Sequence, residues 1–399
     1  MIVDSYVNGL KAYVEAADYA GYDPYDALNS SLLKALSRRS KWLRIAFTHA
    51  LKMSPINLRP LVGVRKGHNP KGVGLFIWAY SRLYALHREK QYLDSIHHLL
   101  NLLEELKSRG YSGNCWGYNF DWQNRVMFLP KHTPTIVNSA FIGHALLDAY
   151  SLCRIDRSLD MAIPIKDFIL KDLNRRHEGD GLCFSYTPLD HNFVHNANLL
   201  GASLLIRLHR LCGDRLLEEA GLASLVYSLS HQRDDGAWGY AETDLQRWVD
   251  SFHTGFNLQA LQYFIAEGYS SRCQRQYKSG LEYYTGHFFL ADGTPKYYDN
   301  RVFPVDIHSP CQAIVVLSNG LAGHYGLVDR ILQWTLQHML SPKGYFYFRK
   351  GLFLANKIPY MRWSQAWAFH ALTSYSYNLS KQPQYGSPHL LQLCKFGSI

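Results

Sequence analysis

The feature that most constrains the fold is a motif that recurs, with drift, along most of the chain. Each copy has a Gly and aromatic cluster, a polar loop, and an apolar helix whose first turn carries His, Asp, Asn or Gln. The five clusters begin at Gly113, Gly181, Gly236, Gly293 and Gly344 and step by 68, 55, 57 and 51 residues. Self-similarity at such a period is typical of repeat folds with about two helices per repeat. The pattern therefore predicts a ring of helical hairpins with polar groups gathered at one rim.

Two kinds of helical segment alternate along this repeat. Six segments open just after polar loops and are rich in small and apolar residues, which indicates buried inner helices. They begin near Pro70, Pro134, Asn196, Ser251, Ser309 and Met361. The segments between them, such as residues 91–106 and 214–229, have the amphipathic spacing of outer helices. The alternation predicts an all-α fold, an (α/α)6 toroid that forms a complete or incomplete barrel of hairpins, with short β-hairpins in the rim loops.

Composition favours one folded body. Hydrophobic residues make up 47% of the 399-residue chain and charged residues 19%, and no Pro/Ser/Gly-rich linker divides it. We expect a single toroid domain over residues 1–399, with residues 1–66 as an N-terminal helical extension. The first residues lack a basic segment followed by an apolar one, and no run reaches the ~18 apolar residues of a membrane span, so a cytoplasmic location is expected.

Cysteine usage argues against a disulfide framework and a zinc ribbon. The seven cysteines occur singly, without a Cys-x-x-Cys pair, and reduced structural thiols are expected. They are Cys115, Cys153, Cys183, Cys212, Cys273, Cys311 and Cys394.

The formal charge of +10 favours an acidic partner. Many of the basic residues lie early: Lys34, Arg38, Arg39, Lys41, Arg44, Lys52, Arg59, Arg65, Lys66 and Lys71. Two interpretations are open, a solvated helix face with loop charges, or contact with an anionic glycan or an anionic membrane surface. Nucleic acid is not expected as a partner, because no motif that reads it accompanies the charge.

The candidate site residues follow from the geometry of such a ring. Inner helices that run in the same direction bring their N-termini to one end, where free backbone N–H groups favour anions. The polar residues of these turns and loops are His68, Asn69, His132, Asn138, His191, His195, Asn196, Asn198, Asp250, His253, Asp306, His308, Gln312, Arg362 and Gln365. Each has a simpler explanation, since Ser, Asp and Asn before a helix are usually N-caps, and buried His residues usually serve packing.

Two short strings carry the strongest chemical signal. Residues 250–254 and 306–309 each place a carboxylate, an imidazole and a hydroxyl within a few residues, the ingredients of acid–base catalysis. His253 and His308 are the candidate bases, with Asp250, Asp306, Tyr240 and Tyr297 as further catalytic candidates. The candidates for substrate binding are Arg362, Gln365, His132, His191, His195, Asn196, Asn198, Trp116, Trp238, Trp248 and Tyr186. Aromatic faces can lie on a pyranose, and packing between rim loops is the alternative for these rings.

The string at residues 250–254, with Trp248 before it, resembles the Trp-Asp-Tyr-His-Thr-Thr stretch of the glucuronyl C5-epimerases, with spacing that differs by one residue. The C-terminal part of those enzymes is an α/α toroid. The Gly-aromatic repeat is similar to that of six-hairpin carbohydrate enzymes, which include unsaturated uronyl hydrolases, polysaccharide lyases and sugar epimerases. The cluster at Gly236 also resembles the Gln/Trp repeat of squalene cyclases and prenyltransferase β-subunits, but their Asp-x-Asp-Asp motif is missing.

These observations predict a uronate C5-epimerase or lyase that acts on an anionic polysaccharide or oligosaccharide by proton abstraction. Arg362, with Asn196 or Asn198, would hold the carboxylate. The alternatives are a hydrolase that uses Asp250 and Asp306, a terpene-cyclase-like toroid, and a non-catalytic glycan-binding or assembly protein. No cofactor is expected, because the chain has neither a phosphate loop nor a dinucleotide fingerprint. No metal is expected either, since His191 and His195 have ligand spacing but no Glu between them.

Overall fold

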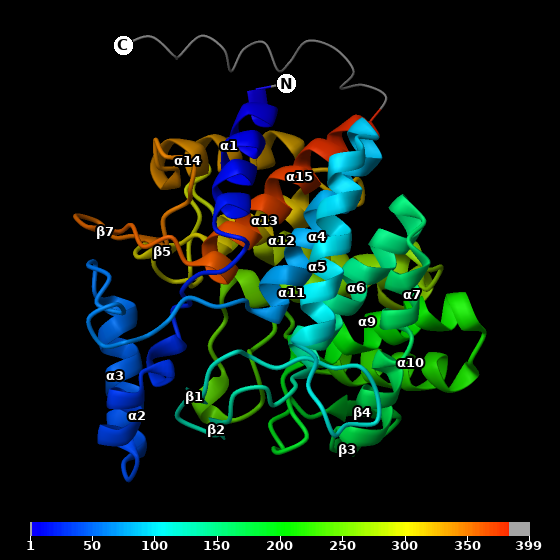
Figure 1. Cartoon of the computed structure of the whole chain (residues 1–399). Coiled ribbons are helices and arrows are strands. Elements are labelled where there is room, and N and C mark those ends of the chain that lie inside the picture. Colours follow the sequence, from blue (N-terminus) through cyan, green and yellow to red (C-terminus); the bar gives the residue numbers. More distant parts are fainter. Residues whose placement is uncertain (1, 383–399) are drawn as a thin grey trace.

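The computed structural model describes residues 2–382, and most of them lie in helices that pack side by side (Figure 1). The inner helices are α4 (Pro70–His87), α6 (Ile136–Cys153), α9 (His195–Cys212), α11 (Ser251–Ala266), α13 (His308–Leu317), and a π-helical turn η4 (Met361–Ala366) that continues as α15 (Trp367–Ser380). Each packs against the next along the chain, and α15 packs against α4 to close the ring. The predicted (α/α)6 toroid is therefore confirmed, and its barrel is complete.

Six helical segments form the outer layer. They are α1 (Ile2–Ala16), α5 (Lys90–Glu105), α7 (Asp156–Ala162) with α8 (Ile165–Asp167) and η2 (Phe168–Asp172), α10 (Arg215–Ser230), α12 (Ser270–His287) and α14 (Tyr325–Met339). α5 buries one apolar stripe of Tyr92, Ile96, Leu99, Leu100 and Leu103 against α4, as expected for an amphipathic outer helix. α1 packs on α15, so the first helix of the chain supplies the sixth outer position.

Polar side chains cap three of the inner helices, α4, α6 and α11. Thr135 accepts a hydrogen bond from the backbone N–H of Asn138 at the start of α6, and Asn69 accepts from Lys71 N at the start of α4. Among the described residues, α6 alone is long and apolar enough to cross a membrane, but 72% of it is buried inside the ring, as expected of a core helix. The outer segment that starts at Asp156 breaks near Pro164, because proline cannot donate a backbone hydrogen bond.

The glycines that open the repeat lie where rim turns touch the outer layer. Gly113, Gly181, Gly236, Gly293 and Gly344 each face backbone atoms of an outer-helix segment. At Gly236, φ is +91° and an added Cβ would lie 2.3 Å from the carbonyl oxygen of Ser279 in α12. Gly344 faces Gly9 of α1, so the same contact joins the last turn of the ring to its first helix. The close approach of the two backbones therefore explains why glycine recurs at this position of each repeat.

Short antiparallel strands occupy the rim loops, as the sequence predicts. β1 (Trp122–Gln123) pairs with β2 (Phe128–Leu129), and β3 (Arg175–Glu178) pairs with β4 (Gly181–Phe184). A three-stranded sheet has the order β5 (Val305–Asp306), β6 (Arg349–Lys350) and β7 (Ala355–Asn356). A 3-10 turn, η3 (Asp244–Gln246), precedes α11.

An insertion between α1 and α4 forms a separate small cluster at the rim. It contains a 3-10 turn η1 (Asp26–Asn29), α2 (Ser31–Ser37) and α3 (Lys41–Met53), and its own core includes Ala27, Leu33 and Leu51. η1 and α2 are separate elements because Ser30, in an extended conformation, caps α2. Arg59 fixes the insertion to the ring: it bonds Asp26 at 2.6 Å and the hydroxyl of Tyr360 at 2.8 Å, and its side chain is fully buried.

The cysteines among the described residues are free thiols. Five are buried, Cys212 is exposed, and Cys394 lies outside the described residues.

Candidate active site

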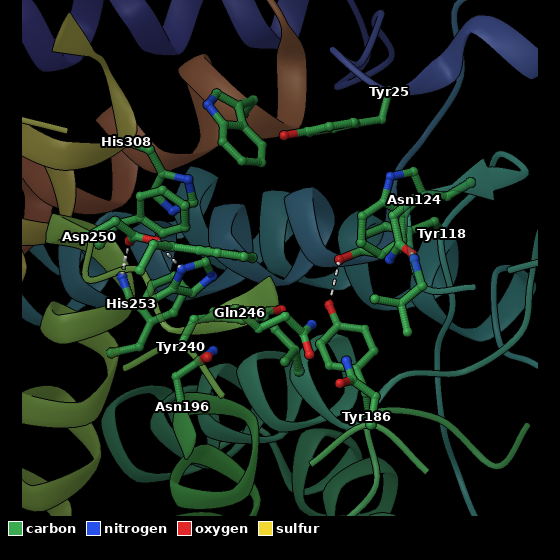
Figure 2. A pocket seen from close by; sticks show the side chains of 18 of the residues that line it. Tyr25, Tyr118, Asn124, Tyr186, Asn196, Tyr240, Gln246, Asp250, His253 and His308 are labelled. Atoms are coloured by element: carbon green, nitrogen blue, oxygen red, sulfur yellow. Dashed lines mark hydrogen bonds and ion pairs between the residues drawn. The ribbon is translucent and has the colours of Figure 1, made fainter. Parts of the chain in front are cut away.

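The first turns of all six inner helices line one cavity of about 490 Å³. Their contributions are Lys71 from α4, Val137 from α6, Asn196 from α9, His253 from α11, His308 from α13 and Arg362 from η4. The prediction that these helix N-termini converge is therefore confirmed. In Figure 2 the acid–base residues lie on one wall of the cavity, and Tyr118, Tyr186 and Asn124 lie on the other.

Asp250 and His253 form a hydrogen-bonded pair on that first wall. Oδ1 of Asp250 accepts the backbone N–H of His253 at 3.0 Å, which caps α11. Oδ2 lies 2.7 Å from Nδ1 of His253 and accepts the indole N–H of Trp248 at 3.1 Å. A carboxylate at Nδ1 favours the tautomer in which Nε2 is free to accept a proton. The capping and the catalytic interpretations of Asp250 are thus compatible, because one oxygen caps α11 while the other is paired with His253.

His308 lies close to this pair, stacked on Phe252, the same aromatic ring that neighbours His253. Both ring nitrogens are buried without a hydrogen bond among the described residues. The ring stacks on Phe252 at 4.5 Å and lies 4.3 Å from the ring of Trp367. Burial holds the pKa of His308 well below its usual value, and the charges of Lys71 and Arg362 lower the pKa further. The imidazole is therefore neutral at ordinary pH, with both nitrogens available to a bound molecule.

Lys71 lines the cavity, although from the sequence it is no more than one of many basic residues early in the chain. Its Nζ lies 4.1 Å from the ring centre of Phe141, 5.1 Å from Phe256 and 5.2 Å from Trp367. Burial, assisted by the charge of Arg362, holds the pKa of this ammonium well below its usual value. Its place as the second residue of an inner helix, directly after the Asn69-Pro70 start, is the signal that could have identified it.

Tyrosines supply much of the remaining wall. The hydroxyls of Tyr118 and Tyr186 lie 3.2 Å apart, and the ring of Tyr240 stacks on Trp248 at 4.9 Å. Burial raises the pKa of Tyr240, and burial and the charge of Asp250 raise that of Tyr297. These phenols therefore remain protonated and can donate hydrogen bonds to sugar oxygens.

Arg362 lines the cavity, but a carboxylate of the chain already holds it. Nε and Nη2 of Arg362 donate to the two oxygens of Asp23 at 2.6 and 2.8 Å, and both side chains are buried. This bidentate pair balances the charge of the guanidinium. Its donors are therefore less available for a substrate carboxylate than the sequence analysis expected.

Asp306 lies behind the cavity wall. It accepts Arg349 Nε at 2.7 Å, the indole N–H of Trp363 at 2.7 Å and the backbone N–H of His308 at 3.1 Å, and its side chain is fully buried. Asp250 is the one carboxylate among the described residues that line the cavity. The two Asp/His strings, similar in sequence, thus have different structural positions.

Several other candidates do not line the cavity, and most of them form hydrogen bonds with neighbouring loops or outer helices. Nε2 of His195 lies 2.5 Å from Glu242, Asn198 bonds the backbone of Phe184, Leu182 and Ser224, and Gln365 bonds both backbone groups of Phe346. The indoles of Trp116 and Trp238 donate to the carbonyl groups of Leu103 and Ser228. His132 and His191 are exposed and lie outside the cavity lining. By contrast, Asn196, Trp248 and Tyr186 do line the cavity.

Residues from outside the repeat complete the site. Tyr25 and His49 come from the insertion, and Asn124 comes from the β1–β2 hairpin. Burial raises the pKa of Tyr25 to about 12. Within residues 2–382, no group of three or more His, Cys, Asp or Glu side chains is placed to hold a metal ion.

No protein-family model and no curated protein matches the chain by sequence. Solved structures match its fold. A cellobiose 2-epimerase from Bacillus thermoamylovorans has a TM-score of 0.61 and 14% identity, over 79% of this chain and 90% of the other. A family 88 glycosyl hydrolase from Bacteroides vulgatus has a TM-score of 0.55 and 10% identity, over 81% and 95%. A polysaccharide lyase has a TM-score of 0.53 and 11% identity, over 77% and 88%. Because these identities are low, the matches show a shared fold and nothing more.

Proposed function

We propose that the protein is a carbohydrate-active enzyme that moves a proton at a sugar carbon, as an epimerase or a lyase. The observation that carries this proposal is the Asp250–His253 pair, whose imidazole faces a cavity lined by aromatic rings. An oriented histidine is the usual general base at neutral pH, and aromatic faces suit the C–H face of a pyranose. The epimerase and the lyase with the same fold are compatible with this chemistry.

The proposed reaction begins at a C–H bond next to a carbonyl or carboxyl group. His253 Nε2 takes the proton, the C–H electrons move toward the adjacent oxygen, and Asp250 stabilises the imidazolium through Nδ1–H. A neutral N–H of His308 can donate a hydrogen bond to the oxygen that gains charge. Return of a proton to the opposite face gives the epimer. Departure of the oxygen substituent from the next carbon gives an unsaturated product, which is the lyase outcome.

A uronate is the substrate class that we propose, with C5 as the reacting carbon. The basic side chains Lys71, Arg125 and Arg362 line the cavity, against one carboxylate, Asp250. Six helix N-termini also point their free N–H groups toward this end of the ring, which favours a bound anion. Because Asp23 already binds Arg362, Lys71 is the basic side chain best placed to pair with a substrate carboxylate.

Hydrolysis is less well supported by the same residues. Glycosidases of the common types use two carboxyl groups that flank the scissile bond, about 5 to 9.5 Å apart. Asp306, the second carboxylate that this mechanism would need, is buried between Arg349 and Trp363. The cavity therefore favours proton transfer over two-carboxylate hydrolysis.

A screen of uronate-containing polymers and oligosaccharides in deuterated water tests the proposal, with matched neutral sugars as controls. We expect NMR to detect deuterium at C5 of a uronate, with either an inverted C5 centre or a new double bond. Exchange in neutral sugars alone would contradict the uronate assignment. Cleavage without any C–H exchange would contradict the proton-transfer proposal and favour a hydrolase.

A further inference from the structure

The insertion and two rim hairpins expose many large apolar side chains. Twelve of the nineteen exposed large hydrophobic side chains among the described residues come from three segments, residues 31–66, 122–129 and 349–356. They are Leu32, Leu36, Trp42, Leu43, Met53, Ile56, Leu61, Val126, Phe128, Leu352, Phe353 and Leu354. We call these three segments the basic apolar face. Soluble monomers rarely expose large contiguous apolar patches, which usually mark an interaction site.

Direct contacts hold the three segments together. Lys41 of α3 donates to the carbonyl of Arg125 at 2.7 Å, and Arg44 donates to Gln123, which joins α3 to the β1–β2 hairpin. Asn356 of β7 donates to the carbonyls of Lys52 and Ser54 at the end of α3. In Figure 1, α2, α3 and β7 lie on the same side of the ring. The exposed apolar side chains therefore belong to one continuous part of the surface.

The three segments of the basic apolar face contain no Asp or Glu, and the carboxylate next to them, Asp121, pairs with Lys34 at 2.5 Å. Residues 27–88 contain no Asp or Glu. The exposed basic side chains in the insertion are Lys34, Arg38, Arg39, Lys41, Arg65 and Lys66. Lys52 and Arg59, which the sequence analysis counted with them, point inward: Lys52 donates to the hydroxyl of Tyr25 at 2.6 Å, and Arg59 pairs with Asp26. Basic side chains beside exposed Trp, Leu and Phe are typical of surfaces that lie on anionic membranes.

We propose that the basic apolar face docks on an anionic phospholipid bilayer. Trp42, Leu36 and Phe353, which are 67%, 59% and 90% exposed, would enter the interface between headgroups and acyl chains. The exposed lysines and arginines would contact the anionic headgroups. Docking would bring the bilayer next to the cavity, since His49 and Val126 line the cavity and belong to this face. The proposal does not depend on the reaction, because binding to a membrane can be measured without a substrate.

Co-sedimentation of the full chain with lipid vesicles tests the proposal. Vesicles of phosphatidylcholine with about 30% phosphatidylglycerol are compared with pure phosphatidylcholine, at low and high salt. We expect binding to the anionic vesicles that weakens with salt, and little binding to the neutral ones. Failure to bind the anionic vesicles at low salt, or equal binding to both kinds, would overturn the proposal.

Two sets of variants locate the binding surface. The pair Arg38→Gln and Arg39→Gln should weaken binding about 30-fold, because each basic residue near an anionic surface contributes about 1 kcal/mol and 1.4 kcal/mol is tenfold. The triple variant Leu36→Ser, Trp42→Ser and Phe353→Ser should also lose binding. The matched controls are Arg272→Gln with Arg275→Gln on α12, and Leu216→Ser on α10, which are exposed elsewhere.

These controls should bind as the parent does. If they lose binding as strongly as the variants of the basic apolar face, binding would be nonspecific and the proposal wrong. If the parent forms a dimer that the triple variant dissolves, and neither binds vesicles, the surface is an interface between copies of the chain.

Discussion

At the residue scale, the two Asp/His strings show how far sequence reasoning reaches. The first-turn position of Asp250 and Asp306 is predictable, because both precede inner helices in the repeat. The roles of these two residues are not predictable, because the partners of Asp306 are distant in sequence. Arg349 lies in β6 and Trp363 in η4. Sequence spacing alone does not reveal such long-range ion pairs, and Arg362 with Asp23 is a second case.

The surroundings of Asp306 lead to a stability prediction. The substitution Asp306→Asn removes the charge that balances Arg349, whose side chain is only 15% exposed. Breaking a buried ion pair on one side typically costs about 3 to 5 kcal/mol of unfolding free energy. We expect a clear drop in the urea midpoint and a loss of turnover that follows the loss of folded protein. Normal stability with abolished turnover would instead show that Asp306 acts on the substrate.

Buried histidines predict how stability depends on pH. Burial lowers the pKa of His308, and of His144 and His370 in the ring, well below the value in the unfolded chain. The unfolded chain therefore binds more protons at acid pH, so the unfolding free energy falls as pH drops below about 6.5. His308→Gln should make this decline shallower by up to about 1.4 kcal/mol per pH unit.

Chemical denaturation at pH 7, 6 and 5 measures that slope. His191→Gln, a change at an exposed histidine outside the cavity, is the matched control and should leave the slope unchanged. An identical slope in the parent and His308→Gln would contradict the assigned burial of the imidazole.

At the element scale, periodicity predicts the inner helices well and the segments outside the repeat poorly. Apolar composition after a polar loop identifies α4, α6, α9, α11, α13 and α15, because each inner helix is buried on most of its surface. The insertion and the β1–β2 hairpin have no periodic partner in the chain. Their cavity residues Tyr25, His49 and Asn124 therefore carry no local signal, since their positions depend on tertiary contacts.

The repeat glycines offer a test at this scale. Gly236→Ala would place Cβ 2.3 Å from the carbonyl oxygen of Ser279, in addition to the strain of a positive φ. Gly213 has φ +70° and nothing lies within 4 Å of an added Cβ. Gly213→Ala therefore measures the backbone strain of a positive φ alone, which costs about 1 to 2 kcal/mol. We expect Gly236→Ala to lower the thermal unfolding midpoint by clearly more than Gly213→Ala. Equal effects would mean that the turn does not pack closely on α12.

At the scale of the whole molecule, ring closure explains why one site forms. Parallel inner helices bring six N-terminal turns to one end, and this convergence is predictable from the repeat alone. The repeat does not predict that α1 contacts α15 or that the insertion covers part of the rim. Both features depend on how distant parts of the chain pack. The sequence therefore predicts that a polar rim exists, and the structure shows which of its residues face the cavity.

Deuterium incorporation at the reacting sugar carbon, compared between the parent and His253→Gln in deuterated water, tests the central claim most directly. We expect the parent to exchange the C5 proton of a uronate. His253→Gln should exchange it about 10² to 10⁴ times more slowly at a near-normal melting temperature, since it keeps the fold but loses the base. His191→Gln should exchange as the parent does. A parent that exchanges no C–H proton in any sugar, or a folded His253→Gln that exchanges at the parent rate, would contradict the assignment of this cavity to proton transfer.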